Sequence, residues 1–448
     1  MEQNKNKFSN WIRNSITARM LVVGVLLLVL LIPLSFVKDL ITERSYRQKE
    51  VVNEINSKWG NEVILSGPIL KIPYTIEKEE KSYNKKTESY FTTTKELSKF
   101  AYFFPEKLHI DSKVETKPLN RSIYKSVVYN SDIQVSGEFP IIDFSSEAVK
   151  PKSINWKKAS IILQTSNLKG IRNTIEVQLG NQKLNMNPKY DTSSLNTIQS
   201  GAIPHIAENM LSPTPFSFTI NVNGSESLQF IPIGKETSAT MTSNWHSPSF
   251  NGLFLPEDGS RKITPSGFSA SWKVLQINRQ FEQAFFGYLP DLQEFSFGTK
   301  LIIPVDEYQK SERTAKYGFL VIGLTLLVFL MIQLVSKIYI HPFQYVMVGL
   351  ALVMFYTLLI SISEHSTFLK AYLIAAASVL ILIGAYSRAI LKGYKFPLLI
   401  SVSLASLYGF IYIIIQLESY ALLVGSIGLF AILAIIMFAS RKIDWGNN

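Results

Sequence analysis

Long apolar stretches interrupt polar sequence in a pattern that divides the chain into a membrane part and an extramembrane part. Six stretches contain no Asp, Glu, Lys, Arg or His, and each approaches the ~20 residues that a helix needs to cross ~30 Å of hydrocarbon. We therefore predict a polytopic α-helical membrane protein with six spans, arranged as one plus five. The stretches are Met20–Val37, Gly318–Val335, Phe343–Ile362, Ala371–Tyr386, Phe396–Gln416 and Tyr420–Ala439.

The long segment between the first and second stretches has a different period. Hydrophobic and polar residues alternate there with a period of two, which is typical of half-buried strands. We predict a turn at Asn223-Gly224 and a helical stretch near Asn278–Gly287. The segment is predicted to be a large, mostly-β domain, built as a sandwich or as two adjoining sheets. The clearest alternating runs are Ile133–Val135, Ile175–Leu179 and Phe216–Val222.

These patterns predict an order of segments along the whole chain. The first apolar stretch is read as an uncleaved signal anchor, because no small-x-small cleavage site follows it. The polar residues after it contain no Gly or Pro before Gly60, so the helix is expected to continue outward. The predicted segments are an N-terminal tail (1–19), the anchor (20–37), a helical extension (38–59), the mostly-β domain (60–305), a pre-membrane segment (306–317), a five-helix bundle (318–439) and a C-terminal tail (440–448).

Basic residues orient this layout. They gather in the two tails and in the loops after the second and fourth spans, whereas the other short loops offer only Lys370 beside Glu364 and Glu418. The positive-inside rule therefore predicts that both tails are cytoplasmic and that the large domain lies outside. We expect a multi-pass protein of the bacterial inner membrane with a periplasmic domain. The basic residues are Lys5, Lys7, Arg13, Arg19, Lys337, Arg388, Lys392, Lys395, Arg441 and Lys442.

Composition excludes several classes of function. The net charge is +11, but most of it lies in the predicted cytoplasmic tails and loops, so nucleic acid is not expected as a partner. There is no cysteine, which excludes disulfides and thiolate chemistry. No phosphate loop, HExxH helix or GxSxG elbow occurs, and the five histidines lack metal-ligand spacing, so no cofactor or metal is expected. Spans without ionisable residues also argue against ion- or proton-coupled transport.

Several distinctive motifs lie in order along the chain. The most specific is Thr242–Gly252, which reads TSNWHSPSFNG, followed by Phe254-Leu255-Pro256. Further motifs are Glu43-Arg44 with Tyr46-Arg47, Gly67-Pro68 with Ile72-Pro73, Asp306 with Tyr308, Arg313 with Ala315-Lys316-Tyr317, His341-Pro342-Phe343-Gln344-Tyr345, Gly349–Tyr356, Ser363-Glu364-His365, and Arg441 with Ile443-Asp444-Trp445.

These motifs resemble those of the CreD family of inner membrane proteins. The resemblance implies a cell-envelope integrity protein, controlled in some bacteria by a two-component system that responds to growth conditions or envelope damage. It implies no known chemistry. Two departures from the family's pattern stand out. His246 follows Trp245 where relatives often have Pro, and Asn167 and Lys169 precede Gly170-Ile171 where relatives often have Asp and Arg.

Several residues are candidates for recognition, and each has a simpler structural reading beside it. Trp245, His246, Pro248, Ser249 and Phe250 form either a binding loop or an ordered loop whose aromatic side chains fill the core. Glu364-His365 is a proton-sensitive pair, a contact to the β domain, or a plain polar helix cap. His341-Pro342 reads most simply as a tight helix connection, and Gly425 and Gly428 as small residues for close helix packing. Arg313 is expected to extend toward lipid headgroups.

Three hypotheses of function follow. The first is a non-enzymatic envelope protein that binds or organises envelope proteins or membrane lipids through its periplasmic domain, and the sequence sets no oligomeric state. The second is a transporter or channel component for a neutral or amphipathic compound, which requires a cavity among the C-terminal helices. The third is an enzyme that uses His246 with Ser247 or Ser249, although no orienting acid accompanies them. The family resemblance favours the first.

Overall fold

A computed structural model describes residues 15–84, 89–145, 151–204, 206, 212–301, 303, 307–336, 338–391, 393–417 and 420–441. The chain divides into two compact units. One is a helical unit made of Met1–Glu50 and Val305–Asn448, and the other is a β unit made of Val51–Pro304. Asp444 and Trp445 lie outside the described residues.

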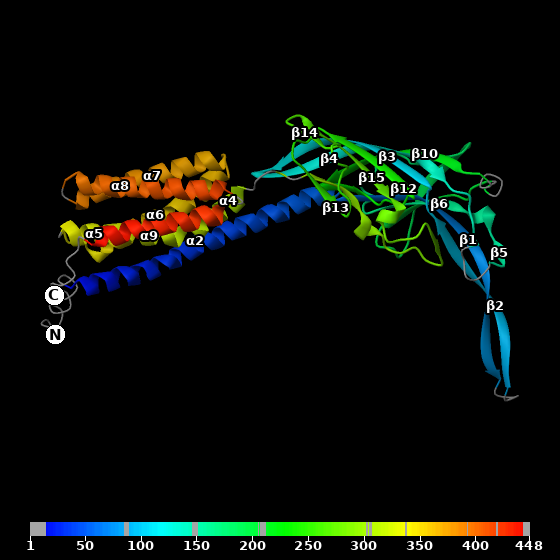
Figure 1. The fold of residues 1–448 in the computed structure, drawn as a ribbon, viewed down its shortest axis with the longest axis horizontal. Coiled ribbons are helices and arrows are strands. Elements are labelled where there is room, and N and C mark those ends of the chain that lie inside the picture. Colours follow the sequence, from blue (N-terminus) through cyan, green and yellow to red (C-terminus); the bar gives the residue numbers. More distant parts are fainter. Residues whose placement is uncertain are drawn as a thin grey trace. The chain divides into compact units, whose positions relative to one another are not determined.

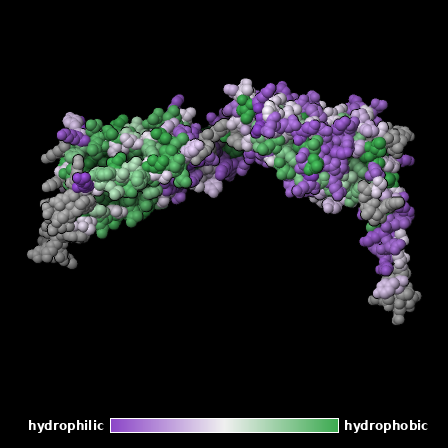
Figure 2. Space-filling model, in the orientation of Figure 1, coloured by the Kyte–Doolittle hydropathy of each residue, from purple (hydrophilic) through white to green (hydrophobic). Residues whose placement is uncertain are grey.

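The described residues include six helices that are long and apolar enough to cross a membrane, one near the N-terminus and five near the C-terminus. The predicted fold class, one plus five spans around a large mostly-β domain, is confirmed (Figure 1). Hydrophobic residues cover most of the visible surface of the five C-terminal helices (Figure 2). The six helices are α2 (Ile16–Trp59), α5 (Gly318–Ser336), α6 (Pro342–Ser363), α7 (Phe368–Ile390), α8 (Lys395–Gln416) and α9 (Ala421–Ser440). The shorter helix α4 (Glu307–Lys316) precedes α5.

Helix α2 continues well beyond its apolar part. It has 44 residues with Pro33 inside it, and at 1.5 Å per residue it is about 66 Å long, roughly twice the thickness of the hydrocarbon core. Its sequence becomes polar after Val37, but no Gly or other Pro interrupts it before Trp59. Gly60 follows with φ +154°, a backbone conformation that favours glycine and ends the helix.

The β unit contains seventeen strands among the described residues, and they fall into two sheets. In the first sheet, β1 pairs with β2, β5, β6 and β11. Strand β2 also pairs with β16, and β6 pairs with β9, which pairs with β8. In addition, β11 pairs with β17, which pairs with β13. The strands are β1 (Val63–Asn84), β2 (Ser89–Phe103), β3 (Lys107–Arg121), β4 (Tyr124–Phe139), β5 (Ser153–Ile154), β6 (Ser160–Thr165), β7 (Glu176–Leu179), β8 (Gln182–Lys189), β9 (Asn196–Ser200), β10 (Thr214–Ser225), β11 (Ser227–Phe230), β12 (Glu236–Ser243), β13 (Pro248–Gly252), β14 (Lys262–Thr264), β15 (Gly267–Leu275), β16 (Ala284–Phe286) and β17 (Phe297–Leu301).

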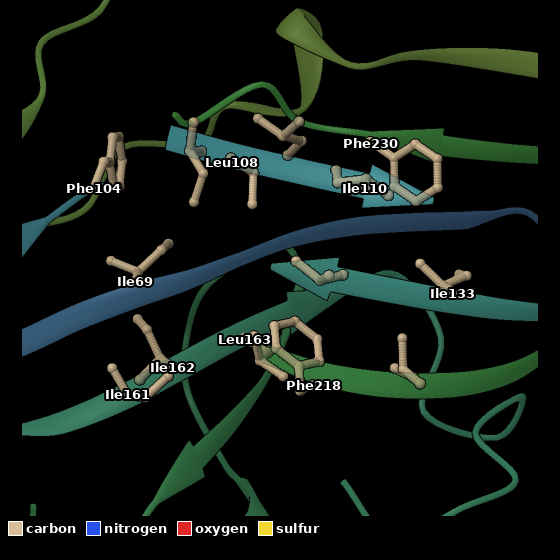
Figure 3. Close-up of a cluster of buried hydrophobic side chains, with 14 of the residues drawn as sticks. Ile69, Phe104, Leu108, Ile110, Ile133, Ile161, Ile162, Leu163, Phe218 and Phe230 are labelled. Atoms are coloured by element: carbon tan, nitrogen blue, oxygen red, sulfur yellow. The ribbon is translucent and has the colours of Figure 1, made fainter. Parts of the chain in front are cut away.

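The second sheet has the order β14-β15-β12-β3-β4-β10-β7-β8. Strand β8 belongs to both sheets, because its first half pairs with β7 and its second half with β9. The sheets also share one hydrophobic core, in which Ile69 and Ile162 from the first sheet lie with Ile110 and Phe218 from the second (Figure 3). The unit is therefore a sandwich whose sheets are joined along one strand.

The first two strands form a long hairpin. Their pairing runs from Leu70↔Phe103 to Asn84↔Ser89. β5 and β16 pair only with the part near the sandwich, at Tyr74–Thr75 and Ala101–Phe103. The remainder projects from the β unit as a two-stranded arm (Figure 1).

The predicted turn at Asn223-Gly224 is wrong. Both residues continue β10, which pairs with β4 as far as Ser225, and the chain bends only at Glu226, where φ is +63°. Glycine is needed at position 224 for space, since a Cβ atom there would lie 2.2 Å from the Tyr129 hydroxyl and 2.8 Å from a Val63 methyl group. The dipeptide therefore marks a close approach between elements and not a reversal of the chain.

The predicted helical stretch near Asn278–Gly287 is also wrong. A short 3₁₀ turn (Gln276–Asn278) precedes it, and Ala284–Phe286 forms β16 beside β2. Arg279 turns inward between them: its side chain is buried and donates hydrogen bonds to the carbonyls of Ile233 and Phe281 at 3.1 and 3.0 Å. These tertiary hydrogen bonds outweigh the local preference for helix.

Candidate functional site

A polar cluster lies where α6 turns into α7. Glu364 follows α6 directly, and its side chain is only 14% exposed. One of its carboxylate oxygens accepts a hydrogen bond from the Tyr308 hydroxyl of α4 at 3.1 Å and lies 3.8 Å from Nε of Arg44 on α2. One carboxylate thus connects three segments that are distant in the sequence. We call this cluster, together with Glu307 and Phe368, the Glu364 junction.

Helix α4 holds the other side of the same turn. A Glu307 carboxylate oxygen accepts a hydrogen bond from the backbone N–H of Phe368 at 3.0 Å, at the N-terminus of α7. An acidic side chain is favourable there because the first N–H groups of a helix lack partners within the helix. The Lys310 ammonium lies 5.5 Å from the centre of the Phe368 ring. The pre-membrane segment therefore clamps the α6–α7 turn.

The sequence of α4 explains its orientation. Its buried residues recur at a helical period, while Glu312, Arg313 and Lys316 are exposed on the other side. Arg313 takes no part in the Glu364 junction, and its approach to lipid headgroups stays a prediction. His365 is also exposed, and Glu364 is engaged by Arg44 and Tyr308. The buried residues are Tyr308, Ser311, Thr314 and Ala315.

His341, Pro342 and Gln344 form the start of α6. The Nδ1 atom of His341 accepts a hydrogen bond from the Phe343 N–H at 3.2 Å, and Oε1 of Gln344 accepts one from the His341 N–H at 2.9 Å. Pro342 occupies the first turn of the helix. This reciprocal arrangement is a capping box and uses the imidazole as a helix cap. Tyr345 lies in the same turn, and its buried hydroxyl donates to Gln333 of α5 at 2.6 Å.

The Trp245–Phe250 segment divides between surface and core. His246 is exposed and its ring lies 5.2 Å from that of Trp245, which is half-buried and donates from Nε1 to the Ser247 carbonyl at 3.0 Å. Pro248, Ser249 and Phe250 belong to β13. The Phe250 ring packs edge-on against Phe268 and Trp272. The core-filling interpretation therefore describes Phe250 and the half-buried Trp245, which both pack against the core, and His246 is the exposed member that a partner could contact.

The end of α2 is held in the β unit by hydrogen bonds that the sequence did not reveal. The amide of Asn56 donates to Glu226 at 2.5 Å and accepts from the Ser126 hydroxyl at 2.6 Å. The Trp59 indole N–H donates to the Tyr129 carbonyl at 3.1 Å, and the Asn167 amide donates to the Gly60 carbonyl. We call this set of residues, with Asn223 and Gly224 beneath it, the α2 socket.

The α2 socket gives the family departure at Asn167 a structural role. Its side-chain oxygen accepts a hydrogen bond from the Lys169 N–H at 2.9 Å, while its amide satisfies the last carbonyl group beyond α2. Burial raises the pKa of the Tyr129 hydroxyl, which donates to the Ser227 carbonyl at 2.7 Å, so that this group stays neutral. At the exposed rim, Lys58 and Arg121 bind Glu54 and lower the pKa of its carboxyl group.

A cavity of about 480 Å³ lies within the helical unit between α5, α8 and α9. Its lining is apolar apart from the side chains of Thr325, Ser403 and Ser406. Gly428 lines it opposite Phe410, and a Cβ atom at Gly428 would lie 2.0 Å from that ring, so the close-packing prediction is confirmed there. At Gly425 a Cβ atom would make only ordinary contact, 3.8 Å from Ile414.

No group of three or more His, Asp or Glu side chains that could hold a metal ion occurs among the described residues. Of the singled-out polar residues, His341 and Gln344 cap α6, while Tyr345 and Glu364 link neighbouring elements. None of these four is arranged as a nucleophile with its base.

The fold and these joints define a polytopic membrane protein with one large inserted β sandwich. The family model described as "Inner membrane protein CreD" matches residues 15–446, and the chain belongs to this family. It is also similar to the inner membrane protein CreD of Escherichia coli (strain K12), with 30% identity over 434 residues, which cover 93% of this chain and 91% of the relative. These similarities support a multi-pass protein of the inner membrane.

Proposed function

We propose that this chain supports the cell envelope without catalysing a reaction, by binding or organising envelope proteins or lipids through its β unit on the periplasmic side. The observation that carries the proposal is the way the β unit is tied into the chain. The α2 socket fixes its beginning to the end of one membrane helix, and about five residues separate its last strand from α4. A domain attached at both ends is suited to present a binding surface at a membrane.

The exposed edge of the Trp245–Phe250 segment is where we expect contact with a partner. In-cell photo-crosslinking from a probe residue at position 246 tests this, with a probe at Ile277, which is 89% exposed in the same unit, as the matched control. We expect mass spectrometry to identify one envelope protein or one lipid class captured from position 246 and not from 277. Equal capture of the same mixture from both positions would reject a binding role for the segment.

Substitution of His246 separates a binding protein from an enzyme. The exposed imidazole has a ring contact with Trp245, and truncating one side chain of a binding surface usually costs little, so His246→Ala is expected to leave the fold and envelope-stress survival nearly unchanged. Complete loss of function in a protein that is still folded and inserted would instead support catalysis by His246 with Ser247 or Ser249.

The periplasmic orientation is part of the proposal and can be measured directly. Because the chain has no cysteine, a single Tyr190→Cys substitution places one thiol at a side chain that is 94% exposed in the β unit. A membrane-impermeant maleimide is expected to label this thiol in intact spheroplasts, whereas Asn448→Cys at the C-terminus reacts only after lysis. The reverse pattern would place the β unit in the cytoplasm.

A carrier for a neutral or amphipathic compound is the second candidate function, and the cavity between α5, α8 and α9 favours it. Transport requires that a ligand pass from one side of the membrane to the other. Proteoliposomes should then exchange an uncharged fluorescent amphiphile faster than liposomes that contain an Ala431→Phe variant with a filled cavity. Equal rates for both proteins would leave the cavity without a transport role.

A further inference from the structure

The cavity between α5, α8 and α9 lies well inside the predicted membrane spans. Thr325 is seven residues from the start of α5, which corresponds to a depth of about 10 Å at 1.5 Å per residue. Ser403 and Ala431 line it from the middle turns of α8 and α9. Only molecules dissolved in the bilayer can reach such a site easily, and its volume falls within the usual range for ligand pockets.

The Thr325 side chain lacks a hydrogen-bond partner. It is 5% exposed, and its hydroxyl oxygen is fully buried without a partner among the described residues. Hydroxyl groups in apolar helices usually bond to a carbonyl of their own helix, as Ser378 does to Ile374 at 2.8 Å. An unsatisfied hydroxyl inside hydrocarbon is costly, so a ligand group at this position would remove a penalty as well as form a bond.

The lining also limits the charge of the ligand. It contains no ionisable side chain, and a charged group about 10 Å deep would have no counter-ion there. The headgroup of an ordinary phospholipid stays at the interface for the same reason. The site therefore suits an amphiphile with a hydrocarbon chain for the apolar walls and one uncharged hydrogen-bonding group for Thr325.

Helix α9 supplies one wall of the cavity but packs loosely. None of its residues is buried, whereas α5 and α8 each bury several. It approaches α8 closely at Gly428, where the Phe410 ring takes the space of a side chain. The contact at Gly428 holds the helices together on one side of the cavity, while loose packing elsewhere leaves room for a hydrocarbon chain to enter.

We propose that this cavity is a binding site for an uncharged membrane lipid whose hydroxyl or ester group bonds to the Thr325 hydroxyl. The inference does not rest on the proposed function, because a lipid could occupy the site in a scaffold or in a carrier. The other occupant that the geometry admits is a helix from a second copy of the chain, and the experiment below separates the two.

The test uses the full-length protein in nanodiscs and two photoactivatable probes with the same diazirine acyl chain, a diacylglycerol and a phosphatidylglycerol. We expect the diacylglycerol to label peptides of α8 and α9 at least fivefold more than the phosphatidylglycerol does. Ala431→Phe fills the cavity and should reduce this labelling at least fivefold. The matched control is Ala439→Phe, an exposed position on the same helix that does not line the cavity, and it should label like the wild type.

Thr325→Val keeps the shape of the side chain and removes the hydroxyl, so folding is not at risk. It should weaken diacylglycerol binding about threefold to tenfold, the range expected for one hydrogen bond, and leave labelling by phosphatidylglycerol unchanged. The proposal is overturned if both probes label equally, if Ala431→Phe has no effect, or if Thr325→Val binds diacylglycerol like the wild type. A spontaneous disulfide between copies of an Ile436→Cys variant would overturn it in favour of a second copy.

Discussion

The α2 socket and the Glu364 junction both fix chain segments that are far apart in the sequence, but they use opposite chemistry. In the α2 socket the central groups are mostly neutral and buried: Asn56 is 3% exposed and bonds to the buried Ser126. In the Glu364 junction the groups are charged and more accessible, since the Arg44 side chain is 42% exposed. The first is a permanent attachment, and the second responds to its surroundings.

The difference follows from what solvent does to each kind of bond. A buried hydrogen bond adds little to the net free energy of folding. Removing one of its two partners, however, leaves the other buried and desolvated without a bond, which costs about 1–3 kcal/mol. A partly exposed ion pair is screened by salt and contributes at most about 1 kcal/mol. The α2 socket should therefore be sensitive to mutation and insensitive to salt, and the Glu364 junction should show the reverse.

The largest effect is expected for Asn56→Ala in the α2 socket. The substitution removes two hydrogen bonds and leaves the Ser126 hydroxyl and the Glu226 carboxylate without them. We expect the free energy of unfolding of the β unit to fall by about 3 kcal/mol. Urea unfolding of the full-length protein in detergent, followed by amide hydrogen exchange at the end of α2, measures this.

Ser57→Ala is the control for that experiment. Ser57 is the next residue of the same helix, and its exposed hydroxyl bonds only to the carbonyl of Glu54. Its cost should stay below about 0.5 kcal/mol. Equal costs for the two variants would mean that the buried hydrogen bonds of Asn56 do not hold the end of α2.

Gly224→Ala should destabilise the α2 socket by steric crowding. The new methyl group would clash with the Tyr129 hydroxyl, which is buried and cannot move without breaking its bond to Ser227. We expect a loss of about 2 kcal/mol in the same unfolding measurement. Gly201→Ala is the matched control, because Gly201 lies in the β unit with open space around its Cβ position and without a positive φ. A loss that is no greater at Gly224 than at Gly201 would show that the close approach of Tyr129 does not require glycine at position 224.

Glu364→Gln should have a smaller effect that depends on salt. The amide oxygen can still accept from Tyr308, but the attraction to Arg44 is lost, so the thermal stability of the helical unit should fall by at most about 1 kcal/mol. Raising the ionic strength should reduce the stability of the wild type toward that of the variant. Glu312→Gln, in an exposed pair with Lys316, is the control. A difference that salt does not change would show that the carboxylate acts without its charge.

The smallest effect concerns pH at the rim of the α2 socket. Lys58 and Arg121 lower the pKa of Glu54 in the folded state, so this carboxylate stabilises the fold above its unfolded pKa, and the contribution is lost as the pH falls through the lowered folded value. The protection factors of the amides at the end of α2, which are corrected for the intrinsic pH dependence of exchange, should be slightly lower below about pH 4.5 than at neutral pH in the wild type. Glu54→Gln should remove this component of the pH dependence, and an unchanged profile would contradict it.

The sequence predicted the spans and the class of the inserted domain because both depend on local periodicity. Phe216, Phe218 and Ile220 alternate with polar residues, and they lie in β10 with their side chains buried. The cap at His341 could also be anticipated, because Pro342 sets a helix start within a few residues. The spans, the strands and the His341 cap were therefore predictable, because a short stretch of neighbouring residues determines each of them.

The α2 socket and the Glu364 junction were not predictable, because the residues that they bring together are far apart in the sequence. Asn56 and Glu226 are 170 residues apart, and Arg44 meets Glu364 across most of the chain. The one local signal for the α2 socket was Asn56, a polar residue on the face of α2 where the neighbouring helical positions are apolar. The turn prediction at Asn223-Gly224 was wrong for the same reason, because the glycine is required by the close approach of Tyr129 on another strand. Nothing in the sequence indicated the cavity beyond the prediction of a bundle of apolar helices.

The parallel pairing of β1 with β11 has a consequence for the order of events during synthesis. Val63 pairs with Leu228, and β11 in turn pairs with β17, which ends at Leu301. Ribosomes add about 5–20 residues per second, so the roughly 240 residues from β1 to β17 take about 10 to 50 s to make. Such non-local pairing is also slow to form. The first membrane helix is thus made long before its socket exists, and the unpaired strands need protection from aggregation in that interval.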